Sequence, residues 1–439
     1  MGHLTAKGVY HSLGKKIDNL TFSTPWNEAF HKVLTELYTE EEADVVVKMP
    51  YGLSNIDRIS KITGYPKNRL LGILDGLTEK GLVMDLYNGG EYHYMQSPIM
   101  VGIFEFTMMR TRGNLNSKVW AGLLHDYLLG NEDFSKANFS DGQKISIARA
   151  IPHRGTIAPE EMVEILSYEK AEEIVAGHNK FAIGICSCRH EKLHNNLKAC
   201  DVPLEVCSSF GFGADYLIRH GMAKEVSRDQ MLENLERSRE IGLVFSADSV
   251  RKNVTFICSC CSCCCTILQG INKFGYPNLL MTSSYIAYIN EEKCKGCSKC
   301  VKACPISAIK LETIDSSEGV AKKKILAKVD RSICLGCGVC SLKCENGALY
   351  LKKREQQVIH PETTFERSVL ACLERGTLQY QIFDDPQALT HSVMRGILGG
   401  FLKLNPVKKA LMSDLFRSRF LAMIAAGVKF QGSEWITRL

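Results

Sequence analysis

Two cysteine ladders of the same spacing decide the C-terminal half of the chain: Cys294-Lys-Gly-Cys297-Ser-Lys-Cys300-Val-Lys-Ala-Cys304-Pro305 and Cys334-Leu-Gly-Cys337-Gly-Val-Cys340-Ser-Leu-Lys-Cys344-Glu345. Each has three cysteines at intervals of three residues and a fourth after four more, the spacing of loops that wrap a [4Fe–4S] cube. Gly296 and Gly336 let these loops curl tightly and turn backbone N–H groups toward the sulfur atoms. Structural zinc sites rarely use this spacing twice. The ladders therefore predict two [4Fe–4S] clusters.

Short strand-like runs precede and follow each ladder, at residues 286–289, 308–311, 325–329 and 348–351. This twofold repeat resembles the bacterial two-cluster ferredoxin domain. The resemblance implies mixed ligand sets: Cys294, Cys297 and Cys300 with Cys344 around one cluster, and Cys334, Cys337 and Cys340 with Cys304 around the other. Glu345 stands where the family pattern has a proline, which puts the rigidity of that loop in question but not its cysteines.

The composition indicates the compartment and the number of domains. The 439 residues include 19 cysteines, and the sequence shows neither a charged leader followed by an apolar stretch nor an apolar run long enough to cross a bilayer. We therefore expect a cytoplasmic protein, with a peripheral position at the inner membrane surface as an option. Its thiols are expected to be reduced or metal-bound. A chain of this length predicts roughly two to four domains.

We predict an α+β multidomain fold. Its parts are a winged-helix-like domain, a linker with a helix, a cysteine-rich α/β metal-binding domain, a dicluster ferredoxin domain, and a helical, basic, amphipathic tail. The corresponding ranges are residues 1–110, 111–160, 161–283, 284–355 and 356–439.

A second group of cysteines lies upstream of the ladders, where no ordinary core requires them. Two apolar, strand-like runs, 181–185 and 254–257, each deliver an Ile-Cys-Ser-Cys sequence, so we expect two strands to bring their carboxyl ends to one place. Neighbouring cysteines on an extended chain face opposite sides, and adjacent pairs share one cube only if the loop curls. The candidate metal ligands are Cys186, Cys188, Cys200, Cys207, Cys258, Cys260, Cys261, Cys263, Cys264 and Cys265.

Ten thiols allow several arrangements: two further [4Fe–4S] clusters, one cluster plus zinc, or one unusual cluster with spare cysteines. Iron–sulfur is favoured over zinc, and a disulfide knot is disfavoured in a reducing compartment. Four basic residues lie between the ligands: Arg189, His190, Lys192 and His194. They either donate hydrogen bonds or positive charge to a cluster, bind an anionic substrate or partner, or form a solvated loop.

The cysteine blocks and the ladders together resemble a poorly characterised group of multidomain iron–sulfur proteins from anaerobic bacteria. The features that carry this resemblance are a Cys-x-Cys-Arg block, a Cys-Cys-rich block and a ferredoxin module, over about residues 145–350. The resemblance supplies no reaction.

The N-terminal sequence predicts helices followed by a hairpin. The expected helices cover residues 26–39, a segment that opens at Thr39, 54–64 and 68–80, and the hairpin covers 82–96. This order resembles a winged-helix domain. Residues 1–110 hold 11 Lys or Arg against 13 Asp or Glu, whereas DNA binding needs a basic footprint. We therefore expect a structural or docking module and disfavour nucleic acid as a partner.

The C-terminal tail carries the positive charge. Residues 391–439 hold eight Lys or Arg and two acidic residues, a balance equal to the net +6 of the whole chain. Interleaved apolar residues make the tail amphipathic. Such a stretch suits an anionic membrane surface or an acidic redox partner, and a packed terminal helix with solvated lysines is the alternative.

These features predict an iron–sulfur electron-transfer protein or redox-complex subunit. It would pass single low-potential electrons between redox partner proteins through at least two [4Fe–4S] clusters, with one or two further centres in the middle domain. Gly211-Phe-Gly213 lacks the third glycine of a dinucleotide fingerprint, and no Walker loop is present. We identify no catalytic residue and expect an electron-transfer component rather than a stand-alone enzyme. Two alternatives stay open: a redox-sensing transcription regulator, and an oxidoreductase with a catalytic middle-domain cluster.

Overall fold

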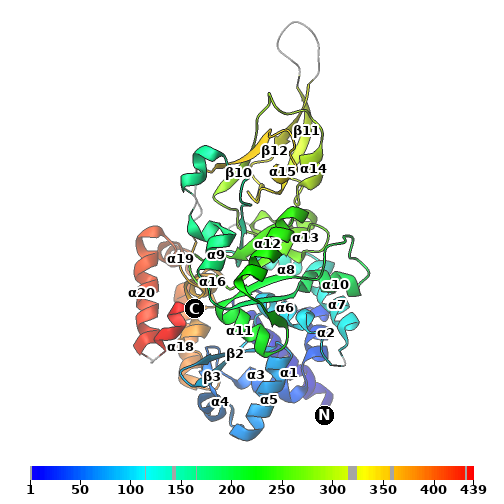
Figure 1. Ribbon diagram of the computed structural model, residues 1–439. Helices are drawn as coiled ribbons and strands as arrows, with labels where there is room; N and C mark the ends of the chain where they lie inside the picture. Colours follow the sequence, from blue (N-terminus) through cyan, green and yellow to red (C-terminus); the bar gives the residue numbers. More distant parts are fainter. Residues whose placement is uncertain are drawn as a thin grey trace.

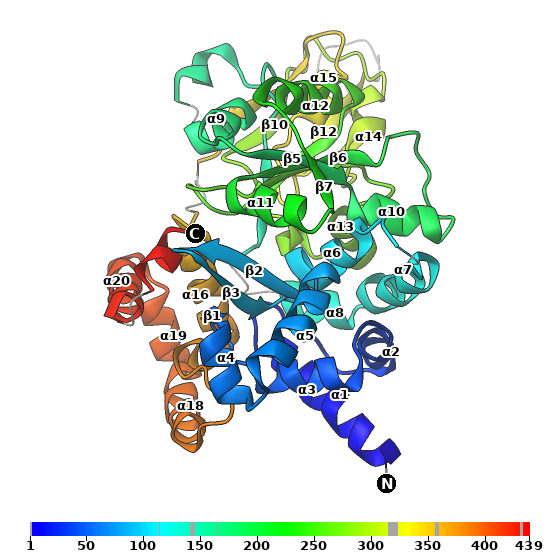
Figure 2. The ribbon, with the colours of Figure 1, turned by 60° about the horizontal axis from the view of Figure 1, so that its bottom comes forward.

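The computed structural model describes residues 2–113, 115–140, 145–164, 166–314, 324–355, 360–430 and 433–439. The ferredoxin domain lies at one end of the molecule, the cysteine-rich domain in the centre, and the N-terminal module at the opposite end (Figure 1). The C-terminal helices lie beside the N-terminal module, as Figure 2 also shows.

Five helices and three short strands form the N-terminal module. Asn27 caps helix α2, because its side chain accepts the Phe30 N–H, and Thr39 and Glu42 form a capping box at the start of α3. The strands pair in the order β1-β3-β2. The elements are α1 (Gly2–Asp18), α2 (Glu28–Leu37), α3 (Glu40–Lys48), β1 (Ser54–Asn55), α4 (Ile56–Thr63), α5 (Lys67–Glu79), β2 (Val83–Asn88) and β3 (Glu91–Gln96). The predicted helices and hairpin are confirmed, and the winged-helix assignment stays a prediction.

A helical segment leads from this module to the centre of the molecule. It consists of η1 (Ile99–Ile103), α6 (Phe104–Met109), α7 (Ser117–His125), η2 (Asp126–Gly130) and α8 (Asp133–Phe139). Helix α6 packs against α10 (Ser187–His194), the helix that follows the first cysteine block. The N-terminal half therefore reaches directly to the cysteines of the middle domain.

An antiparallel sheet in the order β4-β8-β9-β6-β5-β7 forms the middle domain. Strands β5 and β9 are both antiparallel to β6, so they run in the same direction and end at the same edge of the sheet, which confirms the predicted convergence. The strands are β4 (Ala148–Ile151), β5 (Phe181–Ile185), β6 (Glu205–Phe210), β7 (Ala223–Glu225), β8 (Val244–Asp248) and β9 (Phe256–Cys260).

Helices cover both faces of this sheet. Ile174 of α9 and Met231 and Leu235 of α12 share one apolar core with sheet residues, and Tyr216 and Leu217 of α11 share another with α6. The elements are η3 (Pro159–Glu164), η4 (Ser167–Glu169), α9 (Ala171–Ala176), α11 (Gly211–Arg219), α12 (Arg228–Ile241), α13 (Thr266–Phe274) and η5 (Pro277–Leu279).

Strand β4 lies in the range that the sequence assigns to the linker, 111–160, so the sheet begins before residue 161. All four of its residues are buried, including Arg149, and a buried run of four residues lacks the alternation that marks a strand in sequence.

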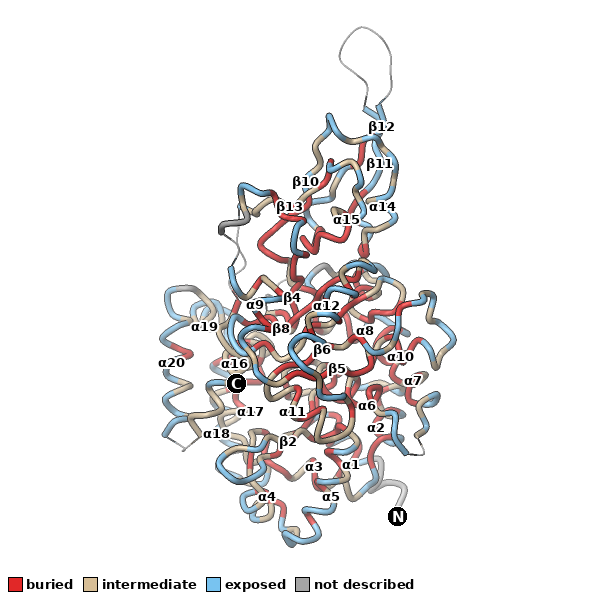
Figure 3. Tube along the Cα trace, in the orientation of Figure 1, coloured by how far each residue is buried: buried red, intermediate tan, exposed pale blue. Residues whose placement is uncertain are grey.

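The ferredoxin domain contains two antiparallel strand pairs, β10 with β13 and β11 with β12. Its elements are β10 (Tyr285–Ile289), α14 (Lys299–Ala303), β11 (Ile309–Ile314), β12 (Lys324–Val329), α15 (Val339–Leu342) and β13 (Leu349–Lys353). The four predicted strands are confirmed. Backbone bonds tie the domain to the body: Ser283 N–H donates to Leu335 O, and Ala158 N–H donates to Leu351 O. Buried residues run through this junction (Figure 3).

The C-terminal region is helical, as predicted, with its own small core around Leu370, Leu373 and Phe420. It consists of α16 (Thr364–Arg375), α17 (Leu378–Ile382), α18 (Leu389–Leu402), α19 (Asn405–Leu411), α20 (Asp414–Phe430) and η6 (Glu434–Arg438). Arg58 of the N-terminal module binds Asp384 at 2.7 and 2.8 Å, so the region is docked on that module. No helix within the described ranges is long and apolar enough to span a membrane.

The N-terminal module is also bonded to the middle domain. Asp85 on β2 accepts hydrogen bonds of 2.8 Å from Arg219 and from His220, at the end of α11. Burial raises the pKa of Asp85, but the hydrogen bonds from His220 and Arg219 outweigh it and hold that pKa below its usual value. The carboxylate thus stays charged and fixes the two domains together.

Candidate metal centres

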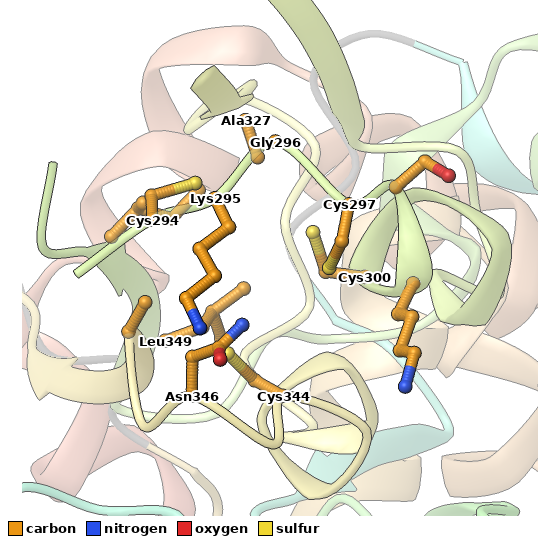
Figure 4. A pocket seen from close by; sticks show the side chains of 13 residues that line it. Cys294, Lys295, Gly296, Cys297, Cys300, Ala327, Cys344, Asn346 and Leu349 are labelled. Atoms are coloured by element: carbon orange, nitrogen blue, oxygen red, sulfur yellow. The ribbon is translucent and has the colours of Figure 1, made fainter. Parts of the chain in front are cut away.

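One cavity in the ferredoxin domain gathers cysteines from both ladders. It is lined by Cys294, Cys297, Cys300 and Cys344. Its empty volume, with the space open to solvent included, is about 370 Å³. Figure 4 shows Cys294 on one side of the cavity, Cys297 and Cys300 on the other, and Cys344 below. Cys297 is exposed. We call these four cysteines the outer set; it is the grouping that the ferredoxin resemblance implies.

The remaining ladder cysteines, Cys304, Cys334, Cys337 and Cys340, form a second and more buried set. Cys334, Cys337 and Cys340 are buried, and burial raises the pKa of Cys337 to about 12, with the neighbouring Cys334 and Cys304 adding to the shift. The Cys304 sulfur accepts the Ala308 N–H at 3.1 Å, the backbone contact that cluster ligands need. These four cysteines, the inner set, lie toward the body of the protein.

The loops of both sets depend on glycine. Gly296 and Gly336 have φ values of 63° and 69°, a conformation that other residues rarely adopt. A Cβ at Gly296 would collide with the carbonyl of Ile325, and one at Gly336 with the carbonyl of Tyr285. Four thiolates per set, in loops closed this tightly, fit a [4Fe–4S] cube.

Six of the ten upstream cysteines form a continuous series in which each thiol is close enough to the next to shift its pKa or to have its own pKa shifted by it. Strands β6 and β9, the start of α10 and the start of α13 supply them. We call this series the six-thiol group: Cys207, Cys258, Cys260, Cys265, Cys188 and Cys186. The sheet register explains part of it, because Gly184 lies opposite Cys207, and Ser208 lies opposite Ile257.

The surroundings of the six-thiol group favour negative charge. Cys186 precedes α10 and Cys265 precedes α13, so two helix N-termini point toward the group. Hydrogen bonds from Cys186 and Cys265, together with the N–H and hydroxyl of Thr266, hold the pKa of Cys188 well below its usual range. A group of thiolates, or a cluster bound by them, is stabilised in such a place.

The other four upstream cysteines form a second group nearer the surface. The sulfur atoms of Cys200, Cys261, Cys263 and Cys264 all lie within 4.8 Å of one another. We call it the four-thiol group. Cys200 comes from the segment between α10 and β6, and the other three come from the turn after β9. The ten candidate ligands are therefore divided between two places.

Arg189 lies between the two groups. Its guanidinium is fully buried, donates to Pro203 O at 3.0 Å and Ser259 O at 3.1 Å, and contacts the Cys261 sulfur at 3.4 Å. A hydrogen bond from Cys264, aided by this guanidinium, lowers the pKa of Cys261 to about 4. Arg189 also acts electrostatically on Cys186 in the six-thiol group.

The basic residues of the first block belong to a buried helix and not to a solvated loop. Lys192 is 1% exposed and binds Glu191 at 2.9 Å, and the His190 ring lies 2.6 Å from Met108 O. The sequence shows the basic residues but not all of their hydrogen-bond partners, since Met108 comes from a distant segment.

Sequence reasoning missed Glu105. This carboxyl is buried, accepts the Gly102 N–H at 3.1 Å, and has a pKa raised to about 8 by burial and by the charge of Cys188. The Gly102 N–H comes from η1, where Val101 has the left-handed φ of 51°. The available signal was one acidic residue inside an otherwise uncharged and mostly apolar run, residues 99–109.

Residues 293–348 match the family described as the 4Fe-4S dicluster domain. Through this domain the chain belongs to the dicluster ferredoxins. The match leaves all ten upstream cysteines outside it. The dicluster domain and the cysteine-rich middle region together support iron–sulfur clusters.

Known relatives resemble parts of the chain. It is 30% identical over 77 residues to Ferredoxin-3 of Rhodobacter capsulatus, which is 14% of this chain and 76% of that protein. An uncharacterized ferredoxin of Methanocaldococcus jannaschii is 26% identical over 123 residues, 27% of this chain and 65% of its own length.

A larger protein also matches. One of the subunits of the H(2):CoB-CoM heterodisulfide,ferredoxin reductase of Methanothermobacter marburgensis is 30% identical over 80 residues. The match covers 16% of this chain and 12% of that protein. No solved structure matches the chain.

Proposed function

We propose that this protein is an iron–sulfur electron-transfer protein or redox-complex subunit that passes single low-potential electrons. The outer and inner sets would each hold a [4Fe–4S] cluster, and the six-thiol group would hold a further iron–sulfur centre. Such centres exchange one electron at a time, near −400 mV for low-potential ferredoxins, as an order of magnitude.

A bonded route from the inner set to the six-thiol group carries this proposal. The backbone N–H of His153 donates to Cys337 O at 3.1 Å, and its ring Nε2 lies 2.7 Å from Leu243 O. The next residue, Val244, pairs with Cys260 across β8 and β9. Burial lowers the pKa of His153 to about 4, so its ring is neutral at pH 7.

The exposure of the ligands gives the route a direction. Cys297 in the outer set is exposed, and three of the four cysteines of the inner set are buried. A redox partner protein would therefore dock at the outer set, and the inner set would connect that surface with the middle domain.

The test is the variant His153→Phe, with His360→Phe as the matched control. Both histidines are buried, and His360 contacts Ser249 away from the route, at 3.1 Å. We expect both variants to keep wild-type iron and sulfide. After rapid reduction, followed by freeze-quench EPR, electrons should reach the middle-domain centre more slowly in His153→Phe alone. Equal rates in the wild type and both variants would contradict the route.

A catalytic middle-domain centre is the second candidate function. Glu105, a buried carboxyl next to Cys188, is the observation that favours it. Such a group can bind or orient a molecule at the six-thiol group. A substrate-induced change in the cluster spectrum that Glu105→Gln abolishes would support this function over electron transfer alone.

The redox-sensing regulator is disfavoured by the basic residues of α5 and its end. Each is paired with an acid of the same module: Lys67 with Asp57 at 2.5 Å, Arg69 with Glu41 at 2.5 Å, and Lys80 with Glu42 at 2.6 Å. We propose that this winged-helix-like module docks proteins. A salt titration of DNA binding by the full chain tests this, and sequence-selective binding at physiological salt would support the regulator.

We propose that the C-terminal tail, residues 391–439, binds an anionic membrane surface. Helix α18 exposes apolar residues at a helical spacing, Leu389 (79%), Val393 (55%) and Ile397 (64%), and α20 exposes Leu415 (75%). The basic residues of 391–439 complement anionic lipid. Co-flotation with anionic but not neutral vesicles is expected, with weaker flotation for Ile397→Ser. Flotation with neither vesicle, or a dimer in solution, would contradict this proposal.

A further inference from the structure

The four-thiol group differs from the ferredoxin sets in how close its sulfur atoms lie. The Cys200 sulfur lies 3.8 Å from that of Cys261 and 3.8 Å from that of Cys264, and the sulfur atoms of Cys263 and Cys264 are 3.6 Å apart. These separations carry information about what the thiols can hold, because thiolates are spread farther apart by a large ligand than by a small one.

A single ion sets a definite separation. Four thiolates at about 2.3 Å from one tetrahedral ion lie about 3.8 Å from one another. In a cube each thiolate binds a different iron, and the irons and sulfides between them push the cysteine sulfurs farther apart. The observed 3.6–3.8 Å distances therefore match one ion.

The ferredoxin domain provides an internal comparison. In the described part of the chain, its eight ladder cysteines form no group of three or more ligand atoms within 4.8 Å of one another. The four-thiol group meets that limit with all four sulfurs. Within the described residues, the structure thus contains ladder thiols too widely spaced for three of them to share one ion, and four thiols close enough to do so.

The chain delivers these four ligands from two segments. Cys261, Cys263 and Cys264 lie in one turn, where Cys265 N–H and Cys264 N–H both donate to Cys261 O. Cys200 reaches them from the segment that leads into β6. Arg189, fully buried and 3.4 Å from the Cys261 sulfur, offsets part of the negative charge of four thiolates around a divalent ion.

We propose that Cys200, Cys261, Cys263 and Cys264 bind one tetrahedral metal ion, zinc(II) or mononuclear iron, separate from any cluster in the six-thiol group. With four protein thiolates the site is closed and leaves no position for a substrate. The ion fastens the segment around Cys200 over the turn that carries Cys264 and Cys265. It thereby holds Cys265 in line with the six-thiol group. The four-thiol group is therefore a structural metal site that joins two segments of the chain, and we call it the clamp.

The experiment begins with the full wild-type chain, purified without oxygen, and counts zinc, iron and acid-labile sulfide. We expect either one zinc per chain or one iron in excess of sulfide, since cubes contain equal iron and sulfide. X-ray absorption at the edge of that metal should show four sulfur neighbours at about 2.3 Å. Both metals support the single-ion site, and the zinc and iron edges distinguish them.

The variant Cys200→Ala isolates the site, because Cys200 lies outside every helix and strand. It should lose one metal ion and no sulfide. Cys372→Ala, which removes a buried cysteine of α16 outside both groups, should lose neither. Loss of four irons with four sulfides from Cys200→Ala would overturn the proposal, as would wild-type protein with no zinc and equal iron and sulfide.

This inference rests on the sulfur positions and not on electron transfer. If the His153→Phe test fails while the extra ion is found, the clamp stands and the electron route falls. If the extra ion is missing while electrons still reach the middle domain along the His153 route, the electron route stands and the single-ion site is wrong.

Discussion

The ferredoxin domain and the middle domain collect similar numbers of thiols by different means. In the ferredoxin domain each ladder supplies three cysteines from one loop, and the fourth cysteine of each set comes from the matching point of the other ladder. In the middle domain the six-thiol group draws on two strands and two helix starts, and the four-thiol group on a separate loop and turn.

The difference has a physical meaning for each cluster site. A loop that carries three ligands needs little from the rest of the fold, so its spacing is nearly sufficient to define the site. Ligands that come from different elements are held only when the sheet and its helices are formed. The middle-domain centres should therefore depend on folding more than the ferredoxin clusters do.

The largest expected effect comes from the ladders. The double variant Cys297→Ala and Cys337→Ala removes one ligand from the outer set and one from the inner set. We expect the loss of roughly eight irons and eight sulfides per chain, because each cube loses a thiolate it cannot replace. Anaerobic iron and sulfide analysis measures this, with Cys372→Ala as control. Unchanged iron content would show that the ladders do not hold cubes.

The next effect concerns the six-thiol group. Cys186→Ala and Cys258→Ala each remove one member of the same series, near its two ends. Each variant should lose roughly four irons or more while the ladder clusters keep their EPR signals. If one variant loses iron and the other retains all of it, the six thiols do not form one centre, and the middle domain assembles its ligands in smaller sets.

The ladders and their flanking strands could be predicted because the information is local. Residues 286–289 and 325–329 were expected as strands, and β10 and β12 contain them. The start of α3 after Thr39 followed from a threonine cap with acidic residues in the first turn, and the structure shows that Thr39 and Glu42 form a capping box there. The convergence of β5 and β9 also followed from the repeated Ile-Cys-Ser-Cys sequence, since both strands end at one edge.

The division of the upstream cysteines could not be predicted. Cys260 and Cys261 are neighbours in sequence, yet the first belongs to the six-thiol group and the second to the four-thiol group, as alternation on an extended chain allows. Cys263 and Cys264 stay together because the turn curls. Cys207 joins Cys258 only through the pairing of β6 with β9. These facts depend on register, which the sequence does not specify.

A smaller effect is expected from replacing Arg189. It concerns the midpoint potential of the six-thiol centre and not its iron content. Arg189→Gln removes a buried positive charge beside both upstream groups and should lower the midpoint potential of the six-thiol centre by about 50–100 mV, because the reduced centre carries more negative charge. Arg189→Lys keeps the positive charge and should shift the midpoint potential less. EPR-monitored redox titration gives both values. If the midpoint potentials of the ladder clusters shift by the same amount, the charge of Arg189 acts on all the clusters and not specifically on the six-thiol centre.

The smallest effect is expected at the one place where the ladders differ. Glu345 occupies the position of Pro305 in the other ladder and binds Lys299 at 2.5 Å, with both side chains exposed. Exposed pairs contribute little stability, whereas a proline that suits its turn restricts the unfolded chain. Glu345→Pro should therefore keep full iron content and the wild-type spectrum, with an unchanged or slightly higher Tm. Glu345→Gln controls for the lost charge. If iron is lost from the outer set in Glu345→Pro alone, the two loops differ in backbone shape, and the equivalence of the ladders ends at their cysteines.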